Sequence, residues 1–481
     1  MINTLPVEML SLIFRFAGGT PKPHLGTVDI YRQNLSLLRL TRVCKRWRSI
    51  AISYPILWQN IAFSPSRLPT VRCAAGFLRW SGSAVLKVQV IDGGDQTTII
   101  YSAEAVNLIE EIAQQSHRII EFEAVGLSEL ISEALIYKAD IIRRLSITGN
   151  PFEKIPLVFG GQLPRLERLA LSNPTGWRLS LFHGVTKVTL HLRECDLHIN
   201  ILLEFLEGAC NLQDLSLSRY RDHDTIRTVD RQPVTLPSLR ELNLSFCDTS
   251  RILSYLHVPS TARILILKGK EEKGRHIFQC LPNAPGFWRF LSTTDSLTLR
   301  LNSTSNEFHL ATFHGYIPLC FLQIYEIRRW VDEGWILRSI YSASRFEQFF
   351  HLRSLTVSVD GHPIPWEVWI SKLDGLAELD ARSTNPEQLA LALRPIRGRV
   401  SCPSLRYLTV EGIATQKLPD ISTLRSSLLA RAAEGHPVFR LRFRGRDWKY
   451  IARVDPCWEG LVRSQGGQRC VLNVFVAQRM S

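Results

Sequence analysis

The residues of this chain whose types could perform chemistry are scattered rather than grouped. His191, Cys195 and His198 have a spacing that could hold a zinc ion on a helix. They follow a strand-like run and no fourth ligand stands near them, so we expect no metal site. No Walker A loop, Gly-x-Gly-x-x-Gly, Gly-x-Ser-x-Gly or His-Glu-x-x-His motif occurs. The sequence therefore predicts no cofactor and no catalytic set, and we expect that the protein is not an enzyme.

A basic and aromatic stretch near the carboxyl end allows two interpretations. It begins with the run Phe439–Arg444 (FRLRFR) and continues to Arg446, Trp448, Lys449 and Tyr450. Arginines beside aromatic side chains could bind single-stranded nucleic acid through phosphate contacts and base stacking. Strict alternation of apolar and charged residues is, however, typical of a half-buried strand. We favour the strand, and we do not expect nucleic acid among the partners.

Length and composition limit the class of protein. The 481 residues exceed one ordinary globular core, so several domains or an elongated repeat are expected. The net charge of +14 is spread along the chain, which favours a solvated basic surface over one acidic partner. The sequence has no run of eighteen apolar residues, and Glu8 and Arg15 interrupt the apolar stretch that a secretory signal would need. The ten cysteines include no Cys-x-x-Cys pair, which fits a reducing compartment. We therefore expect a cytoplasmic or nuclear protein with no membrane partner.

The first sixty residues predict a small helical module. A helix over Thr4–Ala17 has a capping threonine and an early proline, and a glycine pair ends it. Apolar residues at three-and-four spacing predict a second helix over Ser36–Ile52. The turn formers in Gly18–Asn34 indicate a surface loop between the helices, and Pro55–Trp58 offers a short turn with a large aromatic. A module of about sixty residues buries little surface by itself. Apolar side chains that it leaves exposed would therefore suggest a binding partner.

This layout resembles an F-box. The opening Leu-Pro-x-Glu is present as Leu5–Glu8, the central Val-Cys-basic-x-Trp as Val43–Trp47, and the closing Pro-x-Leu-Trp as Pro55–Trp58. The loop Gly18–Asn34 is longer than usual for the family. The resemblance implies binding to a Skp-type adaptor and, through it, to a cullin ubiquitin ligase of which this chain would be a non-catalytic subunit. The candidate adaptor-binding residues, which the sequence cannot separate from the module's own core, are Leu5, Pro6, Leu10, Ile13, Phe14, Val43, Trp47, Leu57 and Trp58.

A repeat follows the helical module. Its pattern is Leu-x-x-Leu-x-Leu, with copies centred on residues 145, 169, 188, 215, 242 and 265 and later on residues 297, 355, 379 and 408. Successive centres in the first group are 24, 19, 27, 27 and 23 residues apart, which is the period of leucine-rich repeats. The combination resembles fungal-type F-box proteins with degenerate leucine-rich repeats. Between the copies at 297 and 355 the period fails, in an aromatic-rich region.

The fold class predicted from these patterns is α+β and multi-domain, with a small helical F-box followed by an α/β leucine-rich-repeat solenoid. We expect the F-box over residues 1–62, a linker over 63–83, the solenoid over 84–418, and a C-terminal capping region over 419–481. The solenoid is expected to be irregular around residues 303–350. In each strand the leucine-type residues would face inward, and the residues between them would form a concave surface.

The function implied by the resemblance is substrate recruitment to an SCF-type ligase. The target would be a protein, as yet unknown, bound on the concave surface. The candidate residues there are Asp214, Ser216, Glu241, Asn243, Glu378, Asp380, Tyr407 and Thr409. This row is acidic and rich in hydroxyl groups, so we expect it to attract a basic segment. The aromatic-rich region between residues 297 and 355 is a rival site. The alternatives are a repeat scaffold that acts outside any ligase and a nucleic-acid binder that uses the basic C-terminal region.

Overall fold

The structure is a computed structural model of the chain. The chain is divided into two compact units. Unit 1 comprises residues 1–230 and 236–239, and unit 2 comprises residues 231–235 and 240–481. The residues whose structure is described are 5–17, 27–91, 101–126, 136–148, 158–161, 163–172, 182–192, 197–220, 232–247, 249–268, 290–302, 307–314, 317–324, 351–359, 364, 366–412 and 422–444.

Unit 1 begins with three helices and a short turn, α1 (Val7–Ala17), α2 (Thr27–Val43), α3 (Lys45–Ile52) and η2 (Pro55–Trp58). The prediction of a single helix over residues 36–52 is therefore wrong, because this segment contains the end of α2 and all of α3, which meet at Cys44. Cys44 has an extended backbone (φ −159°, ψ 170°), and its sulfur accepts a hydrogen bond from the Trp47 N–H at 3.4 Å. The expected loop over residues 18–34 is also wrong in part, since α2 already begins at Thr27.

Residues 63–83, expected as a linker, are folded. They contain the end of β1 (Asn60–Phe63) and all of α4 (Leu68–Trp80). The Thr70 hydroxyl fastens the start of α4, because it donates to the carbonyl oxygens of Arg67 (2.7 Å) and Ser64 (3.0 Å). The proline-rich run that suggests a linker instead supplies a proline in the first turn of a helix, where its missing N–H costs nothing.

The rest of unit 1 is a parallel sheet whose strands follow one another in chain order. These strands are β2 (Leu86–Ile91), β3 (Ile119–Val125), β4 (Arg144–Thr148), β5 (Arg168–Ser172), β6 (Lys187–His191) and β7 (Asp214–Ser218). The leucine-type residues of neighbouring strands stand in register and are buried, as in the row Leu145, Leu169, Val188 and Leu215. The strands predicted from the Leu-x-Leu pattern are thus present in this unit.

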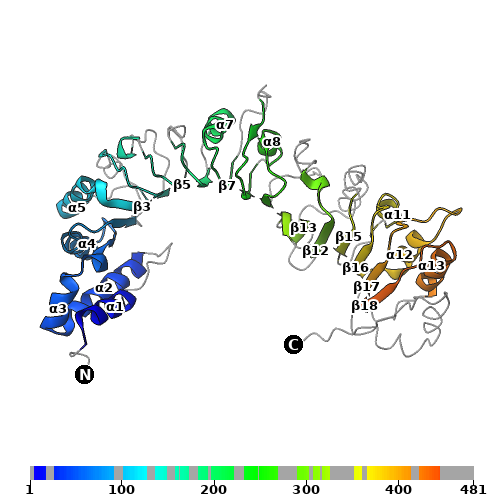
Figure 1. Cartoon of the computed structure of the whole chain (residues 1–481), viewed down its shortest axis with the longest axis horizontal. Helices are drawn as coiled ribbons and strands as arrows, with labels where there is room; N and C mark the ends of the chain where they lie inside the picture. Colours follow the sequence, from blue (N-terminus) through cyan, green and yellow to red (C-terminus); the bar gives the residue numbers. More distant parts are fainter. Residues whose placement is uncertain are drawn as a thin grey trace. The chain divides into compact units, whose positions relative to one another are not determined.

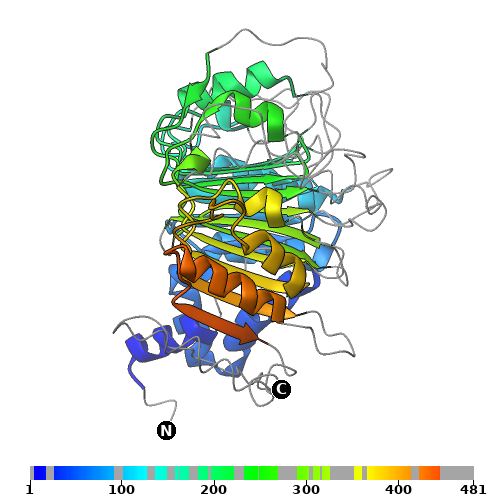
Figure 2. The same cartoon turned by 90° about the vertical axis from the view of Figure 1, so that its right-hand side faces the viewer.

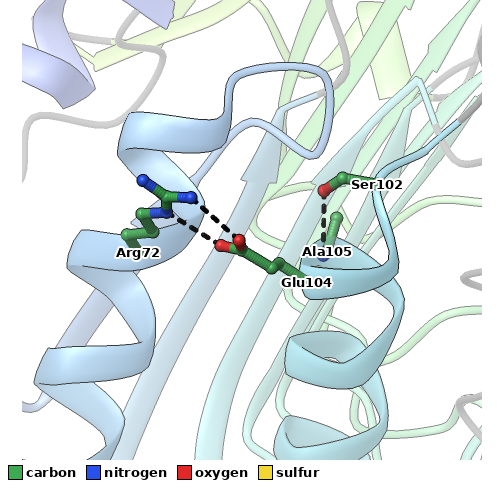
Figure 3. A network of polar contacts seen from close by, with 4 residues as sticks. All are labelled: Arg72, Ser102, Glu104 and Ala105. Carbon is green, nitrogen blue, oxygen red and sulfur yellow. Dashed lines mark hydrogen bonds and ion pairs between the residues drawn. The ribbon is translucent and has the colours of Figure 1, made fainter.

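Helices cover one face of this sheet. The helices α4, α5 (Ala103–Gln114) and α7 (Ile199–Gly208) lie on the same side of the strands, and no described helix covers the other side of β3–β7 (Figure 1). Ser102 caps α5 by accepting a hydrogen bond from the Ala105 N–H at 3.2 Å. Arg72 of α4 donates both to Glu104 Oε1 and to Glu104 Oε2 at 2.9 Å, which joins the two neighbouring helices (Figure 3).

Unit 2 contains a mixed sheet and a small two-stranded one. The small sheet pairs β8 (Val234–Thr235) with β10 (Leu256–His257). The large sheet has the strand order β9, β11, β14, β13, β12, β15, β16, β17, β18. Its strands are β9 (Glu241–Ser245), β11 (Arg263–Lys268), β12 (Ser296–Asn302), β13 (Glu307–His314), β14 (Ile317–Ile324), β15 (Ser354–Val359), β16 (Glu378–Thr384), β17 (Tyr407–Gly412) and β18 (Arg440–Arg444).

The region where the period fails belongs in part to this sheet. β13 runs antiparallel to both β12 and β14, and β14 pairs in parallel with β11. The two strands β14 and β13 thus occupy the positions between β11 and β12. Antiparallel neighbours need no crossover helix, so the spacing of a helix-containing repeat disappears here. Residues 325–350, which hold much of the aromatic-rich region, lie outside the described residues.

The described helices of unit 2 lie on one face of its sheet (Figure 1). These are α8 (Thr249–Ser254), α11 (Trp366–Ile370), α12 (Pro386–Leu393) and α13 (Ser422–Ala433), and α12 and α13 lie side by side over the last strands (Figure 2). The strand interpretation of Phe439–Arg444 is confirmed by β18, in which Leu441 is buried and Arg440 is exposed. Arg446, Trp448, Lys449 and Tyr450 lie outside the described residues.

Candidate functional site

The first candidate site is the amino-terminal helical module, where burial divides the nine predicted residues. Five of them form its core: Leu10, Phe14, Trp47, Leu57 and Trp58. The rings of Phe14 and Trp47 lie 4.9 Å apart, and the Trp58 indole donates to the Ala51 carbonyl oxygen at 2.6 Å. Pro6, Ile13 and Val43 are exposed, and Leu5 is half-buried with its carbonyl oxygen accepting a hydrogen bond from Arg46.

Helix α1 has a second apolar stripe that no described part of the chain covers. This exposed stripe consists of Met9, Leu12, Ile13 and Phe16, and 83% of Phe16 is accessible to solvent. The spacing of three and four residues places these side chains on one face, opposite the buried Leu10 and Phe14. Val7 of α1, Val43 of α2 and Ile56 of η2 add further exposed apolar surface.

Sequence reasoning missed Met9, Leu12 and Phe16, although a signal was present. The helix reads VEMLSLIFRFA, which has apolar residues on nearly its whole circumference. One buried stripe needs only about three or four apolar positions in every two turns. The excess in α1 therefore indicates a second contact surface.

The module is joined to the sheet by an aromatic cluster. The ring of Trp58 lies 4.9 Å from that of Phe77 and 4.8 Å from that of Trp80, both in α4. Trp58 and Phe77 are fully buried. The core of the module thus continues into α4, and Trp58 belongs to this shared core rather than to an exposed docking surface.

The second candidate site is the face of the unit 1 sheet that is opposite the helices, called here the open face. In its first row, Lys87, Glu121, Arg144, Arg168, Lys187 and Asp214 stand in register across β2–β7. The row predicted to be acidic is therefore mostly basic in this unit. Asp214 is at its end, 3.3 Å from Lys187 Nζ, and Ser216 lies half-buried in the next row.

The predicted residues of unit 2 are also closely accompanied by cations. The Asp380 carboxylate accepts a hydrogen bond from the Arg382 guanidinium at 2.7 Å, and this bond raises the pKa of Arg382. The Asp380 side chain is only 13% exposed. Glu241 pairs in register with Arg263, and the Arg440 guanidinium lies 5.6 Å from the Tyr407 ring centre.

Of the other three unit 2 candidates, only Glu378 is acidic. Glu378 is exposed at the start of β16, whereas Asn243 and Thr409 are half-buried. Asn243 Oδ1 accepts from the Ser245 hydroxyl at 2.9 Å, and Thr409 stands in register with Arg442. The row is thus mixed in charge rather than acidic throughout, because the copies of the repeat on which the prediction rested omitted their basic neighbours. That these residues bind a substrate stays a prediction.

The described residues hold no group of three histidine, cysteine, aspartate or glutamate side chains placed to bind a metal ion. His191 ends β6 with its ring nitrogen hydrogen-bonded to the Ser218 hydroxyl, while His198 precedes α7 and Cys195 lies outside the described residues. Burial and the nearby Arg219 charge lower the pKa of His191. Within the described part of the chain, no helix is long and apolar enough to cross a membrane.

The comparison with known proteins bears on the helical module alone. No curated protein matches this chain. Residues 2–64, which contain α1, α2, α3, η2 and β1, match the family model described as F-box-like.

Proposed function

We propose that this chain is the substrate-recruiting subunit of an SCF-type cullin ubiquitin ligase. The observation that carries the proposal is the F-box-like match over residues 2–64, since such domains typically bind a Skp-type adaptor of cullin complexes. In this role the chain performs no bond chemistry. It holds a protein target while another subunit transfers ubiquitin.

The exposed stripe of α1 is the proposed adaptor-binding surface. Soluble proteins seldom leave contiguous apolar surface uncovered unless a partner binds there. Burying one large apolar side chain stabilises a complex by about 1.5–3 kcal/mol. Burial of the exposed parts of Met9, Leu12, Ile13 and Phe16 would therefore offset part of the entropic cost of association. Val43 and Ile56 are candidates for its rim.

The sheets are the proposed substrate-binding part, as a leucine-rich-repeat solenoid over residues 84–418. What supports this is the register of the buried leucine-type residues, in which each strand of β4–β7 packs on its neighbour through the same two positions. A repeat of this kind has little core of its own and is stabilised by stacking. We propose residues 419–481 as its capping region.

The experiment uses the full-length chain and a purified Skp-type adaptor. In the variant Leu12→Gln with Phe16→Gln, both replacements are good helix formers at exposed positions, so the fold should be retained. We expect this variant to lose adaptor binding in a pull-down while its thermal melting is unchanged. The matched control is Ile201→Gln, which removes an exposed apolar side chain from α7 and should bind as the wild type does.

Two outcomes would contradict the proposal. If the folded wild-type chain does not retain the adaptor, the chain acts as a repeat scaffold outside such a ligase. If the double variant binds as well as the wild type, the adaptor-binding surface is not the exposed stripe.

A further inference from the structure

The open face of unit 1 has an unusual distribution of charge. Three cations stand side by side in its first row, Arg144 of β4, Arg168 of β5 and Lys187 of β6. The same three strands contribute Ser146, Ala170 and Thr189 to the second row, and Thr148, Ser172 and His191 to the edge beyond it. Across β4, β5 and β6 this face thus offers positive charge and hydroxyl groups but no carboxylate.

Acidic side chains limit this basic patch on both sides. Glu121 of β3 lies 2.9 Å from Lys87 and 3.5 Å from Arg144, and Asp214 of β7 lies 3.3 Å from Lys187. Arg168, at the centre, is exposed and has no acidic side chain within ion-pair distance among the described residues. The patch is therefore an anion-binding surface of limited width rather than a long basic groove.

The cations of the patch are available to a ligand. The side chains of Arg144 and Lys187 remain 47% and 49% exposed in their ion pairs. Exposed ion pairs of this type stabilise a protein by about 0–1 kcal/mol, so a partner's carboxylate can replace the internal one at little cost. Strands in a sheet are about 4.8 Å apart, so the three cations span about 10 Å.

We propose that this patch binds a short acidic segment of a protein, which would be the recognition element of the recruited target. Alternate side chains of an extended peptide lie on one side about 7 Å apart, so two or three acidic residues match the width of the patch. The hydroxyl groups of Ser146 and Thr189 can donate to the same carboxylates. The identification of the peptide as part of a recruited target rests on the proposed function. The binding of an acidic peptide is inferred from the residues of the patch alone.

A nucleic acid fits the patch less well than an acidic peptide. A polyanion would extend beyond 10 Å and meet Glu121, Glu123 and Asp214. Single strands also bind through base stacking on aromatic side chains. The described residues of β4–β6 place no aromatic ring other than the His191 imidazole on this face. Charge complementarity over a short span therefore favours a peptide.

The test measures binding of fluorescent peptides to the full-length chain by anisotropy at low salt. The probes are a ten-residue peptide of alternating glutamate and serine, the same peptide with glutamine in place of glutamate, and a ten-nucleotide oligothymidine. We expect the glutamate peptide to bind at least ten-fold more tightly than the glutamine peptide, and added salt to weaken its binding. Arg144→Glu with Arg168→Glu should reduce its affinity at least ten-fold.

The control variant is Arg79→Glu, which reverses an exposed charge on α4 without touching the open face. It should bind the glutamate peptide as the wild type does. Equal binding of the glutamate and glutamine peptides, or no effect of the double reversal, would overturn the inference. If the oligothymidine binds more tightly than the glutamate peptide and loses affinity in the double variant, the ligand of the patch is a nucleic acid and the peptide inference is overturned.

Adaptor retention, measured on the same protein samples, separates the two proposals. If the adaptor binds but the glutamate peptide does not, only the inference about the patch fails. If the glutamate peptide binds but the adaptor does not, the ligase function fails and the patch remains a peptide-binding surface.

Discussion

At the residue scale, burial rather than residue type decides what a cysteine can do in this protein. The Cys402 thiol is buried and donates to the Ile370 carbonyl oxygen at 3.0 Å. Burial raises the pKa of Cys402 to about 12, because a thiolate there would lose its hydration. The buried Cys320 also has its pKa raised to about 12 by burial, whereas Cys210 lies exposed at the end of α7.

This difference predicts selective alkylation. At pH 8 a thiol of pKa about 12 is ionised in only about one molecule in 10⁴, and the thiolate is the reactive form. We expect iodoacetamide to modify Cys210 within minutes, and Cys320 and Cys402 only after the chain is unfolded in guanidinium. Peptide mass spectrometry of the native and unfolded protein measures this. Raising the pH from 7 to 9 should still leave Cys402 unmodified in the native protein, because both values lie well below its raised pKa of about 12. Rapid labelling of Cys402 in the native protein would contradict its place in the core.

At the scale of elements, the sheet of unit 1 depends on its inward row and tolerates changes in its outward row. Leu215 of β7 is almost fully buried and stands in register with Val188 of β6. The adjacent Asp214 is partly exposed and forms an ion pair with Lys187. An aspartate at position 215 would be an unpaired charge among apolar side chains.

We therefore expect Leu215→Asp to prevent stable folding of unit 1, with a loss of more than about 4 kcal/mol. The matched change Asp214→Ala removes only an exposed ion pair and should cost about 0–1 kcal/mol. Thermal melting followed by circular dichroism compares the two variants. Similar losses in both would mean that the alternation of inward and outward positions along β7 is incorrect.

The elements that the sequence predicts well are those whose pattern depends on one local period. The Leu-x-Leu strands are such a case, because burial on one face fixes the period. The break at Cys44 is invisible, since the apolar stripe continues at the same spacing from α2 into α3. β13 and β14 are missed because antiparallel neighbours do not require the crossover on which the period depends.

The candidate sites were predicted less completely than the strands. The exposed stripe of α1 needs the packing of α3 to be known, because only burial separates Phe14 from Phe16. The basic patch, by contrast, has a signal in the sequence. Arg144, Arg168, Lys187 and Asp214 each stand directly before the first leucine-type residue of their strand, so aligning all copies places them in one row.

At the scale of the whole molecule, the helical module and the start of the sheet belong to one compact unit. The aromatic cluster of Trp58, Phe77 and Trp80 lies between them, and β1 pairs in parallel with β2. A module that ended near residue 62 would expose Trp58 and leave β1 unpaired. These contacts connect the helical module, with its exposed stripe, to the amino-terminal strands of the sheet, and the proposed function requires such a connection to present a target.

The aromatic cluster of Trp58, Phe77 and Trp80 predicts that a substitution in α4 affects the helices of the module. Phe77→Ala deletes a fully buried ring next to Trp58, and such deletions cost about 3–5 kcal/mol. We expect amide hydrogen exchange in α3 and η2 of the full-length chain to accelerate at least ten-fold, because Ala51 and Trp58 are linked through the indole hydrogen bond. The control is Phe205→Ala, an equally buried ring in α7, which should accelerate exchange in α7 and leave α3 unchanged. Unchanged exchange of α3 in Phe77→Ala would mean that the module folds independently of the sheet, and the aromatic cluster would then not couple the proposed adaptor-binding surface to the sheet.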